Sequence, residues 1–327
     1  MGVKDFMTIV RPSIRATNTS LKVLIEDHPE KDCIGVFMSI LLIQAIKSCQ
    51  SIITQLFTDP EVPINELNEK VCDKLEVYVK AGFTIFCVFD GLPKKLKKDH
   101  AYLSRYGKNE EKKTELEELY KVKSFTSTAE EEINISKVKA LRKHLATFNR
   151  PDLLFELKQE IKKRFKEKAI CIGSAYEADH QLGALYFQGV INYVFTNDSD
   201  LAAIGVDVIT NTDPTGKCFY RSIHNLLTTQ LPETFGVEKK IWKLNILHHA
   251  ACFLGNDFIA RSKGNTPKKL KEFVENVTDE NFELKEDKIV FEYISANVLK
   301  MKKEEKLPHI KNGNTRWQCF HMVLLLL

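Results

Sequence analysis

Short apolar runs alternate with helix-length patterns along the first two thirds of the chain. Each run is bounded by polar or turn-forming residues, which is typical of buried strands. We expect strands at 33–40, 83–89, 169–172, 192–195 and 206–209. Because strands that alternate with helices usually build a parallel sheet, the pattern predicts an α/β fold with a mostly parallel central sheet flanked by helices.

Two segments depart from this alternation. Residues 94–168 form a long, highly charged, helix-favouring stretch with few apolar faces, which predicts a helical insertion that projects from the sheet. After residue 235 the chain becomes helical, and the second part of this region has a glycine-containing turn, Pro267 just inside a new helix and lysines in the first turn.

The composition is that of a globular protein. Of 327 residues, 43% are hydrophobic and 28% charged, which allows a sizeable core. The 48 basic and 44 acidic residues leave a net charge of +4, too small to identify a partner, so local clusters must do so.

The cysteines and the chain ends indicate an intracellular protein. The eight cysteines include no CxxC pair and several lie in apolar runs, which predicts free thiols in a reducing compartment. The N-terminus lacks a long apolar segment, and the apolar run at 322–327 is too short to span a membrane. That run is either a last buried segment or the cut end of a longer protein.

Carboxylates follow two of the expected strands directly. Asp90 comes after the strand at 83–89, and Asp198 and Asp200 follow the strand at 192–195. A helix cap or a solvated turn explains any one of them. Several at corresponding strand ends favour a shared site, because a parallel sheet brings those ends to one edge.

A third strand end and a helix end add further acids. Glu177 and Asp179 follow the strand at 169–172, and Asp257 lies at the end of an apolar helix. Positions i and i+2 of a helix point about 200° apart, so Glu177 and Asp179 can face one metal only if Glu177 lies at the helix start. Oxygen ligands of this kind favour Mg²⁺ or Mn²⁺, and two such ions can support phosphodiester hydrolysis.

Four motifs in order along residues 1–275 carry a family resemblance. They are "MGVKDFMTIVRP", "VFDG", "YEADHQLGALYFQG…TNDSDLAAIG" and "FLGNDFIARSKGNTPKKL". The chain resembles the flap endonuclease/XPG family of structure-specific 5′ nucleases. The resemblance implies a PIN-like nuclease core at 1–93 and 169–235, a helical arch at 94–168, a helix-two-turn-helix region at 236–285 and a C-terminal extension at 286–327.

The resemblance also assigns roles to individual residues. It implies two Mg²⁺ ions, replaceable by Mn²⁺, with Asp90 and Glu177 on one ion, Asp198 and Asp200 on the other, Asp179 between them and Asp257 in support. Lys97 and Arg105 are expected at the scissile phosphate, with Arg105 one residue out of register. The expected DNA contacts are Gly2, Lys94, Lys95, Lys98, Gly264, Lys268 and Lys269.

The basic run from Lys94 to Lys113 allows two interpretations. It contains eight Lys or Arg against three acids, which fits either a solvated helix face or contact with phosphates. Because it begins four residues after Asp90, phosphate contact is the favoured interpretation.

The chain departs from the family pattern at three places. Gly35 stands where the family has an Asp, and Asp32, roughly 10 Å away on the opposite face of the strand, is a poor substitute. Leu41 stands where the family has a stacking aromatic residue, and Asn265 replaces the second glycine of a turn. One metal ligand is therefore missing, and Gly35→Asp is expected to raise cleavage at least tenfold, about 1.4 kcal/mol.

The sequence thus predicts a nuclear, monomeric nuclease of DNA replication or repair that cuts DNA with a 5′ flap, nick or free 5′ end, with protein partners from the same processes. Two alternatives stay open. One is a catalytically weak or inactive homologue that binds branched DNA and recruits partners, and the other is an RNA-directed nuclease.

Overall fold

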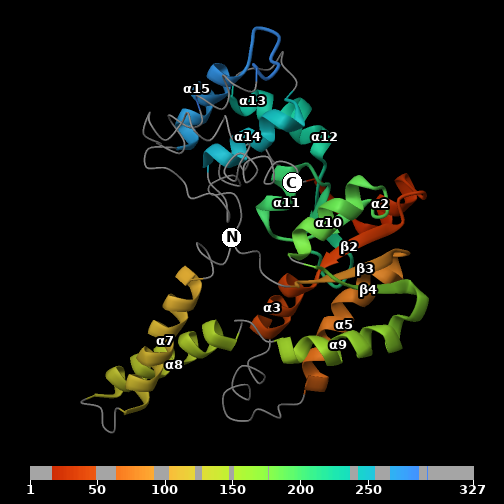
Figure 1. Cartoon of the computed structure of the whole chain (residues 1–327). Coiled ribbons are helices and arrows are strands. Elements are labelled where there is room, and N and C mark those ends of the chain that lie inside the picture. The colour runs from red at the N-terminus through yellow and green to blue at the C-terminus, as the bar shows by residue number, and fades with distance from the viewer. Residues whose placement is uncertain are drawn as a thin grey trace. The chain divides into compact units, whose positions relative to one another are not determined.

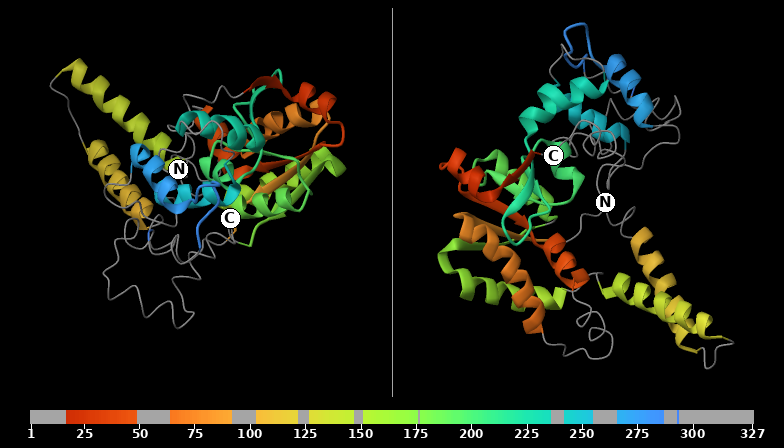
Figure 2. Two further views of the ribbon diagram at one scale, coloured as in Figure 1. Left: turned by 90° about the horizontal axis from the view of Figure 1, so that it is seen from above. Right: turned by 180° about the vertical axis from the view of Figure 1, so that it is seen from behind.

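The computed structural model describes residues 17–48, 64–91, 103–121, 127–146, 151–175, 177–235, 242–254, 266–286 and 293. Figures 1 and 2 show the strands and helices that these residues form. The described residues form two compact units, one from Val36 to Glu177 and one that combines the residues up to Gly35 with those from Ala178 onward. One of the two boundaries between the units, at residues 35 and 36, falls inside a strand, and each unit is described by itself below.

A seven-stranded mixed sheet has the order β1-β7-β6-β5-β2-β3-β4. The pairs β3/β4 and β5/β6 are parallel, whereas β1/β7 and β6/β7 are antiparallel. All five expected strands form. The strands are β1 (Thr17–Ser20), β2 (Cys33–Phe37), β3 (Thr84–Phe89), β4 (Ala169–Gly173), β5 (Tyr193–Phe195), β6 (Val208–Thr210) and β7 (Lys217–Arg221).

The structure corrects two expectations about the strands. The antiparallel strands β1 and β7 were not expected, because β1 is short and polar and β7 has only three hydrophobic residues between Lys217 and Arg221. The strand expected at 33–40 ends at Phe37, and the helix α3 (Met38–Ser48) begins at the next residue. The apolar run continues across this boundary, because β2 and the buried face of α3 both need apolar residues.

In the unit from Val36 to Glu177, helices cover β3 and β4. The helix α5 (Ile64–Ala81) packs against β3, and α9 (Pro151–Phe165) packs against α5 and β4. Leu157 and Ile161 of α9 are fully buried, so this part of the segment 94–168 covers the sheet and does not project from it. A short 3₁₀ turn, η2 (Lys166–Lys168), connects α9 to β4.

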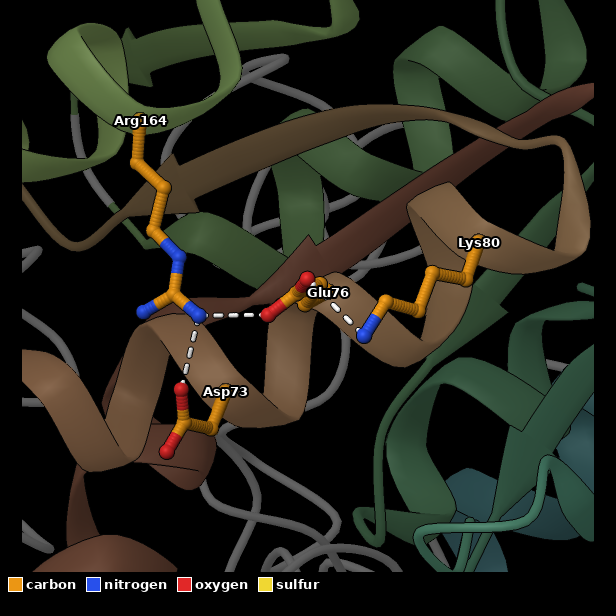
Figure 3. A network of polar contacts seen from close by, with 4 residues as sticks. All are labelled: Asp73, Glu76, Lys80 and Arg164. Carbon is orange, nitrogen blue, oxygen red and sulfur yellow. Dashed lines mark hydrogen bonds and ion pairs between the residues drawn. The ribbon is translucent and has the colours of Figure 1, made fainter.

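An ion-pair network joins α9 to α5 on the surface (Figure 3). The guanidinium of Arg164 contacts the carboxylates of Asp73, at 2.7 Å, and Glu76. Lys80 lies 2.9 Å from Glu76, so the three α5 side chains and Arg164 form one chain of opposite charges. These groups are partly exposed, so their contribution to stability is modest.

The helices α7 (Leu103–Lys121) and α8 (Thr128–Ala146) pack against each other. They confirm that the central part of the charged segment is helical. Leu116 of α7 and Leu141 of α8 are buried, while Ile133 is 57% exposed. This helix pair therefore has a narrow apolar contact and a charged surface.

The second unit holds the remaining helices. α10 packs against β5 and α11, α11 packs against α14, and α14 packs against α15. The elements are α2 (Leu21–Asp27), α10 (Ala178–Phe187), α11 (Ser199–Ile204), α12 (Ile223–Asn225), the π-helical turn η3 (Leu226–Gln230), α13 (Leu231–Phe235), α14 (Leu244–Leu254) and α15 (Pro267–Val277).

The start of α15 confirms the sequence-based prediction. Thr266 is the N-cap and Pro267 opens the helix, where the missing N–H of proline costs nothing. The rings of Phe253 and Phe273, 4.6 Å apart, join α14 to α15.

Among the described residues, Cys72, Cys87, Cys171 and Cys218 form no disulfide, as the sequence predicted. Among the helices of the described ranges, none combines the length and the apolar character that crossing a membrane requires.

Candidate metal centre

Asp90 directly follows β3, and its carboxylate accepts a hydrogen bond from the neighbouring helix α3. The hydroxyl of Ser39, on α3, donates a hydrogen bond of 2.6 Å to Oδ2 of Asp90. Carboxylate oxygens of Asp90 and Glu177 lie within 4.8 Å of each other, close enough to share one cation. The register of β3 and β4 pairs Phe89 with Gly173, so both strands end at the same level and place these two acids together.

The backbone after β3 is held against the backbone after β4. The Ser174 N–H donates to the Phe89 carbonyl at 2.9 Å. A Cβ on Gly91 would lie 1.9 Å from the Ser174 carbonyl oxygen, so only glycine fits at position 91. The Ser174 hydroxyl then donates to the Glu177 carbonyl at 2.9 Å. The two turns that carry Asp90 and Glu177 are thereby tied to each other.

Glu177 lies directly before the first residue of α10. This is the position that it needs if it is to face the same metal as Asp179. Asp179 lies in the first turn of that helix and is 9% exposed. A carboxylate is stabilised there by the helix N-terminus. Glu177 therefore lies at the helix start, the only position at which it was expected to face the same way as Asp179.

Asp179, Asp198 and Asp200 form a second group, with carboxylate oxygens within 4.8 Å of one another. Asp198 is the N-cap of α11, and its Oδ1 accepts from the Asp200 N–H at 3.2 Å. The Asp198 N–H donates to the Thr196 hydroxyl at 3.0 Å. The helix ends one turn later at Gly205, whose φ of 97° favours glycine.

The capping interpretation and the metal interpretation of Asp198 are compatible. The cap uses Oδ1, and an ionised carboxylate has further lone pairs. The structure confirms the cap and leaves the metal role a prediction.

The donor set of this second group fits a divalent cation. Three carboxylates crowded within 4.8 Å repel one another, and the Oδ1 atoms of Asp179 and Asp200 are shielded from solvent. A hard cation with oxygen ligands, such as Mg²⁺ or Mn²⁺, offsets this repulsion. These acids could therefore bind metal.

Gly35 lies in a tight apolar environment. A Cβ at this position would lie 2.5 Å from Cδ2 of Leu182 and 2.5 Å from Cδ1 of Ile191, and both side chains are buried. This packing argues against the expectation that an Asp at position 35 would supply a metal ligand, because any side chain there would have to displace the ends of two buried apolar side chains. Leu41, at the expected stacking position, is also buried.

The structure places few of the expected nucleic-acid contacts. Lys268 and Lys269 lie in the first turn of α15 and are exposed. Arg105 belongs to α7, but the position of its side chain is not described. The remaining expected residues lie outside the described part of the chain, namely Gly2, Lys94, Lys95, Lys97, Lys98, Asp257 and Gly264.

Sequence reasoning missed three residues that position the acids. They are Ser39, Gly91 and Ser174, which contact the strand-end residues as described above. The glycine directly after Asp90 was a signal for Gly91, because a glycine beside a polar strand end often marks a close backbone approach. Ser39 had no local signal, since its partner lies 51 residues away.

Comparison with models of known protein families gave no match, and neither did comparison with curated proteins. Solved structures do match. The catalytic core of Rad2 in complex with DNA substrate has a TM-score of 0.57 and 17% identity, covering 98% of this chain and 86% of that chain.

Two junction-resolving enzymes are also similar. Human GEN1 in complex with Holliday junction DNA has a TM-score of 0.54 and 16% identity, covering 99% of this chain and 65% of that chain. The eukaryotic junction-resolving enzyme GEN-1 binding with cesium has a TM-score of 0.52 and 12% identity, over 99% and 68% of the two chains. At such identities the likeness establishes the fold. The chain therefore shares the fold of the Rad2 catalytic core and of GEN1, which agrees with the fold expected from its motifs.

Proposed function

We propose that this protein is a metal-dependent, structure-specific 5′ nuclease that hydrolyses DNA phosphodiester bonds at junctions between single and double strands. The observation that carries the proposal is the second group of acids, Asp179, Asp198 and Asp200, whose oxygens lie within 4.8 Å of one another. The fold shared with the catalytic core of Rad2 supports it.

The carboxylates have distinct roles in this proposal. Asp90 and Glu177 hold one ion and Asp198 and Asp200 the other, with Asp179 between them and Asp257 in support. Glu177 and Asp179 are two residues apart, so the chain itself links the two groups. Divalent ions, when bound, activate a water molecule and stabilise the leaving oxygen. The helix N-termini at Asp179 and Asp198 favour the ionised acids that this binding requires.

Basic residues bind the DNA backbone. Lys97 and Arg105 contact the scissile phosphate, and Lys268 and Lys269 hold the duplex at the start of α15, where exposed ammonium groups and helix amides favour phosphate. The other proposed DNA contacts are Gly2, Lys94, Lys95, Lys98 and Gly264.

The proposed substrates are DNA molecules with a 5′ flap, a nick or a free 5′ end. Rad2 and GEN1 were each observed with DNA, the latter with a Holliday junction. Flap cleavage by a monomer in the nucleus, during replication or repair and beside protein partners, is part of this proposal.

A second candidate function is binding without efficient cleavage. The packing of Leu182 and Ile191 over Gly35 favours it, because this position offers no carboxylate and a side chain there would have to displace the ends of both apolar side chains. In that case the protein binds branched DNA and recruits partners.

A cleavage assay on labelled 5′-flap, nicked and single-stranded DNA, in Mg²⁺ and in Mn²⁺, tests the proposal. We expect the parent to cut the flap substrate, and Asp198→Asn to lose cleavage while it keeps the α11 cap. The matched control is Asp213→Asn, since Asp213 accepts from the Thr215 N–H at 2.8 Å in an exposed turn of the same unit.

Three outcomes separate the candidates. Cleavage by the parent and the control but not by Asp198→Asn supports the nuclease. Flap binding without cleavage in either metal supports the second candidate. A parent that neither binds nor cuts any of the three DNA molecules overturns both.

A further inference from the structure

We propose that Ser39 is a positioning residue for Asp90, whose carboxylate its hydroxyl orients for a divalent cation. This inference rests on the proposed metal-dependent function. It assigns to α3 a part in the metal centre that none of the sequence motifs suggested.

The contact has the geometry of a strong hydrogen bond. Ser39 Oγ and Asp90 Oδ2 are 2.6 Å apart, which is typical of a hydroxyl that donates to an ionised carboxylate. A serine hydroxyl has one hydrogen to donate, and an ionised carboxylate accepts through several lone pairs. The bond therefore restricts the rotation of the carboxylate while other lone pairs can bind a cation.

Ser39 lies on a rigid element. It is the second residue of α3, and its neighbours Met38, Leu41 and Leu42 are buried. Packing of these apolar side chains fixes the helix, so the hydroxyl has a defined position. A hydroxyl on a mobile loop could not orient a ligand in this way.

The bond is not an ordinary helix cap. A capping hydroxyl accepts from a backbone N–H two or three residues further along its own helix. The Ser39 hydroxyl instead donates to a side chain 51 residues away, at the end of β3. Its role therefore concerns Asp90 and not the start of α3.

Other contacts fix the backbone around Asp90. The Ser174 N–H holds the carbonyl of Phe89, and the backbone of Gly91 lies against the Ser174 carbonyl. These contacts fix the position of the Asp90 backbone. The Ser39 hydroxyl acts on the carboxylate itself, so the two sets of contacts are complementary.

Binding of Mn²⁺ alone, without DNA, tests the role. We would measure it by electron paramagnetic resonance and measure Mg²⁺ by calorimetry, on Ser39→Ala, Ser39→Thr and the parent. Loss of a hydrogen bond to a metal ligand usually costs 10–100-fold in affinity. We expect Ser39→Ala to weaken Mn²⁺ binding about tenfold or more, and Ser39→Thr, which keeps a hydroxyl, to stay within about threefold of the parent.

Ser48→Ala is the matched control. Ser48 is the last residue of the same helix, and its hydroxyl donates to the Ala45 carbonyl at 2.8 Å. The control loses a hydroxyl of α3 that does not contact Asp90, so Mn²⁺ affinity should match the parent.

If Ser39→Ala fails to fold by circular dichroism, Ser39→Val replaces it, because Val and Thr have nearly the same shape and differ in the hydroxyl. Folded Ser39→Ala or Ser39→Val protein with parental Mn²⁺ affinity overturns the role of Ser39 and leaves the proposed function intact. A parent that binds neither ion overturns the proposed function, and the role of Ser39 with it.

Discussion

Oδ1 of Asp198 accepts a hydrogen bond from the backbone N–H of Asp200 at 3.2 Å, so one proposed metal ligand caps the helix that carries the next. Substitutions at Asp198 therefore change two properties at once. Asn retains a capping oxygen and removes the charge, whereas Ala removes both.

The first prediction uses this difference. Asp198→Ala should lose cleavage, keep DNA binding within a few fold, and unfold about 1 kcal/mol more easily than the parent. Asp198→Asn should lose cleavage with nearly parental stability. Urea unfolding and a flap-cleavage assay on the same preparations check this, and equal cleavage by Asp198→Ala and the parent would contradict the metal assignment.

The second prediction concerns Gly35. Gly35→Asp should destabilise the protein by about 3 kcal/mol or more, because the new side chain overlaps Leu182 and Ile191 and buries a charge. Gly35→Ala, which adds the overlap alone, should cost about 1–3 kcal/mol. The measurement is the denaturant midpoint.

The control for Gly35 is Gly107→Ala. Gly107 lies inside α7 with no neighbouring atom within 4 Å of an added Cβ, so the substitution should stabilise by about 0.5–1 kcal/mol. Gly35→Asp protein with parental stability and tighter Mn²⁺ binding would instead favour the expectation from the sequence.

The third prediction concerns Gly91. Gly91→Ala should destabilise the protein by about 2 kcal/mol or more and weaken Mn²⁺ binding, because its Cβ would lie 1.9 Å from the Ser174 carbonyl oxygen and displace Asp90. Gly173→Ala, at the paired end of β4, meets only the Lys158 ammonium at 3.9 Å and should stay within about 0.5 kcal/mol of the parent. Similar losses in both variants would show that the close backbone approach is unimportant.

The fourth prediction is a pH dependence. Hydrogen bonds from Lys80 and Arg164 lower the pKa of Glu76 below its ordinary value. A lowered carboxyl pKa stabilises the fold above the unfolded pKa of about 4.3, and this stabilisation disappears as the pH falls through the lower folded value. Urea unfolding at a series of pH values should therefore find the parent more stable than Glu76→Gln near neutral pH, and the difference should shrink below pH of about 4. A difference that is independent of pH would contradict the ion-pair mechanism.

The fifth prediction concerns the start of α15. Replacing Lys268 and Lys269 by Ala should weaken binding to all DNA sequences alike and reduce the salt dependence by up to about two units of slope. The matched control replaces Lys162 and Lys163, a second exposed lysine pair on α9. Filter binding at several salt concentrations gives the slopes, and an unchanged slope in the α15 variant would show that this turn does not contact phosphates.

The sequence by itself determined the elements whose signal is local. β3 and β5 were predictable because a buried strand needs an uninterrupted apolar run. Asp90 and Asp198 were noticeable because they come immediately after, and three residues after, the end of such a run. The start of α15 was equally local, since Pro267 and its N-cap are adjacent. The alternation of strands and helices gave the α/β class, and the family motifs added the nuclease-core fold, which the similarity to the Rad2 catalytic core supports.

Only the tertiary structure decided the contacts between distant segments. The polar strand β1 pairs with β7 across about 200 residues, and β7 in turn pairs with β6. Ser39 contacts Asp90 because α3 packs beside β3, and Gly35 is enclosed by Leu182 and Ile191 from elements about 150 residues later in the chain. Such contacts depend on which elements pack together in the folded protein, and the local sequence around a residue does not specify this.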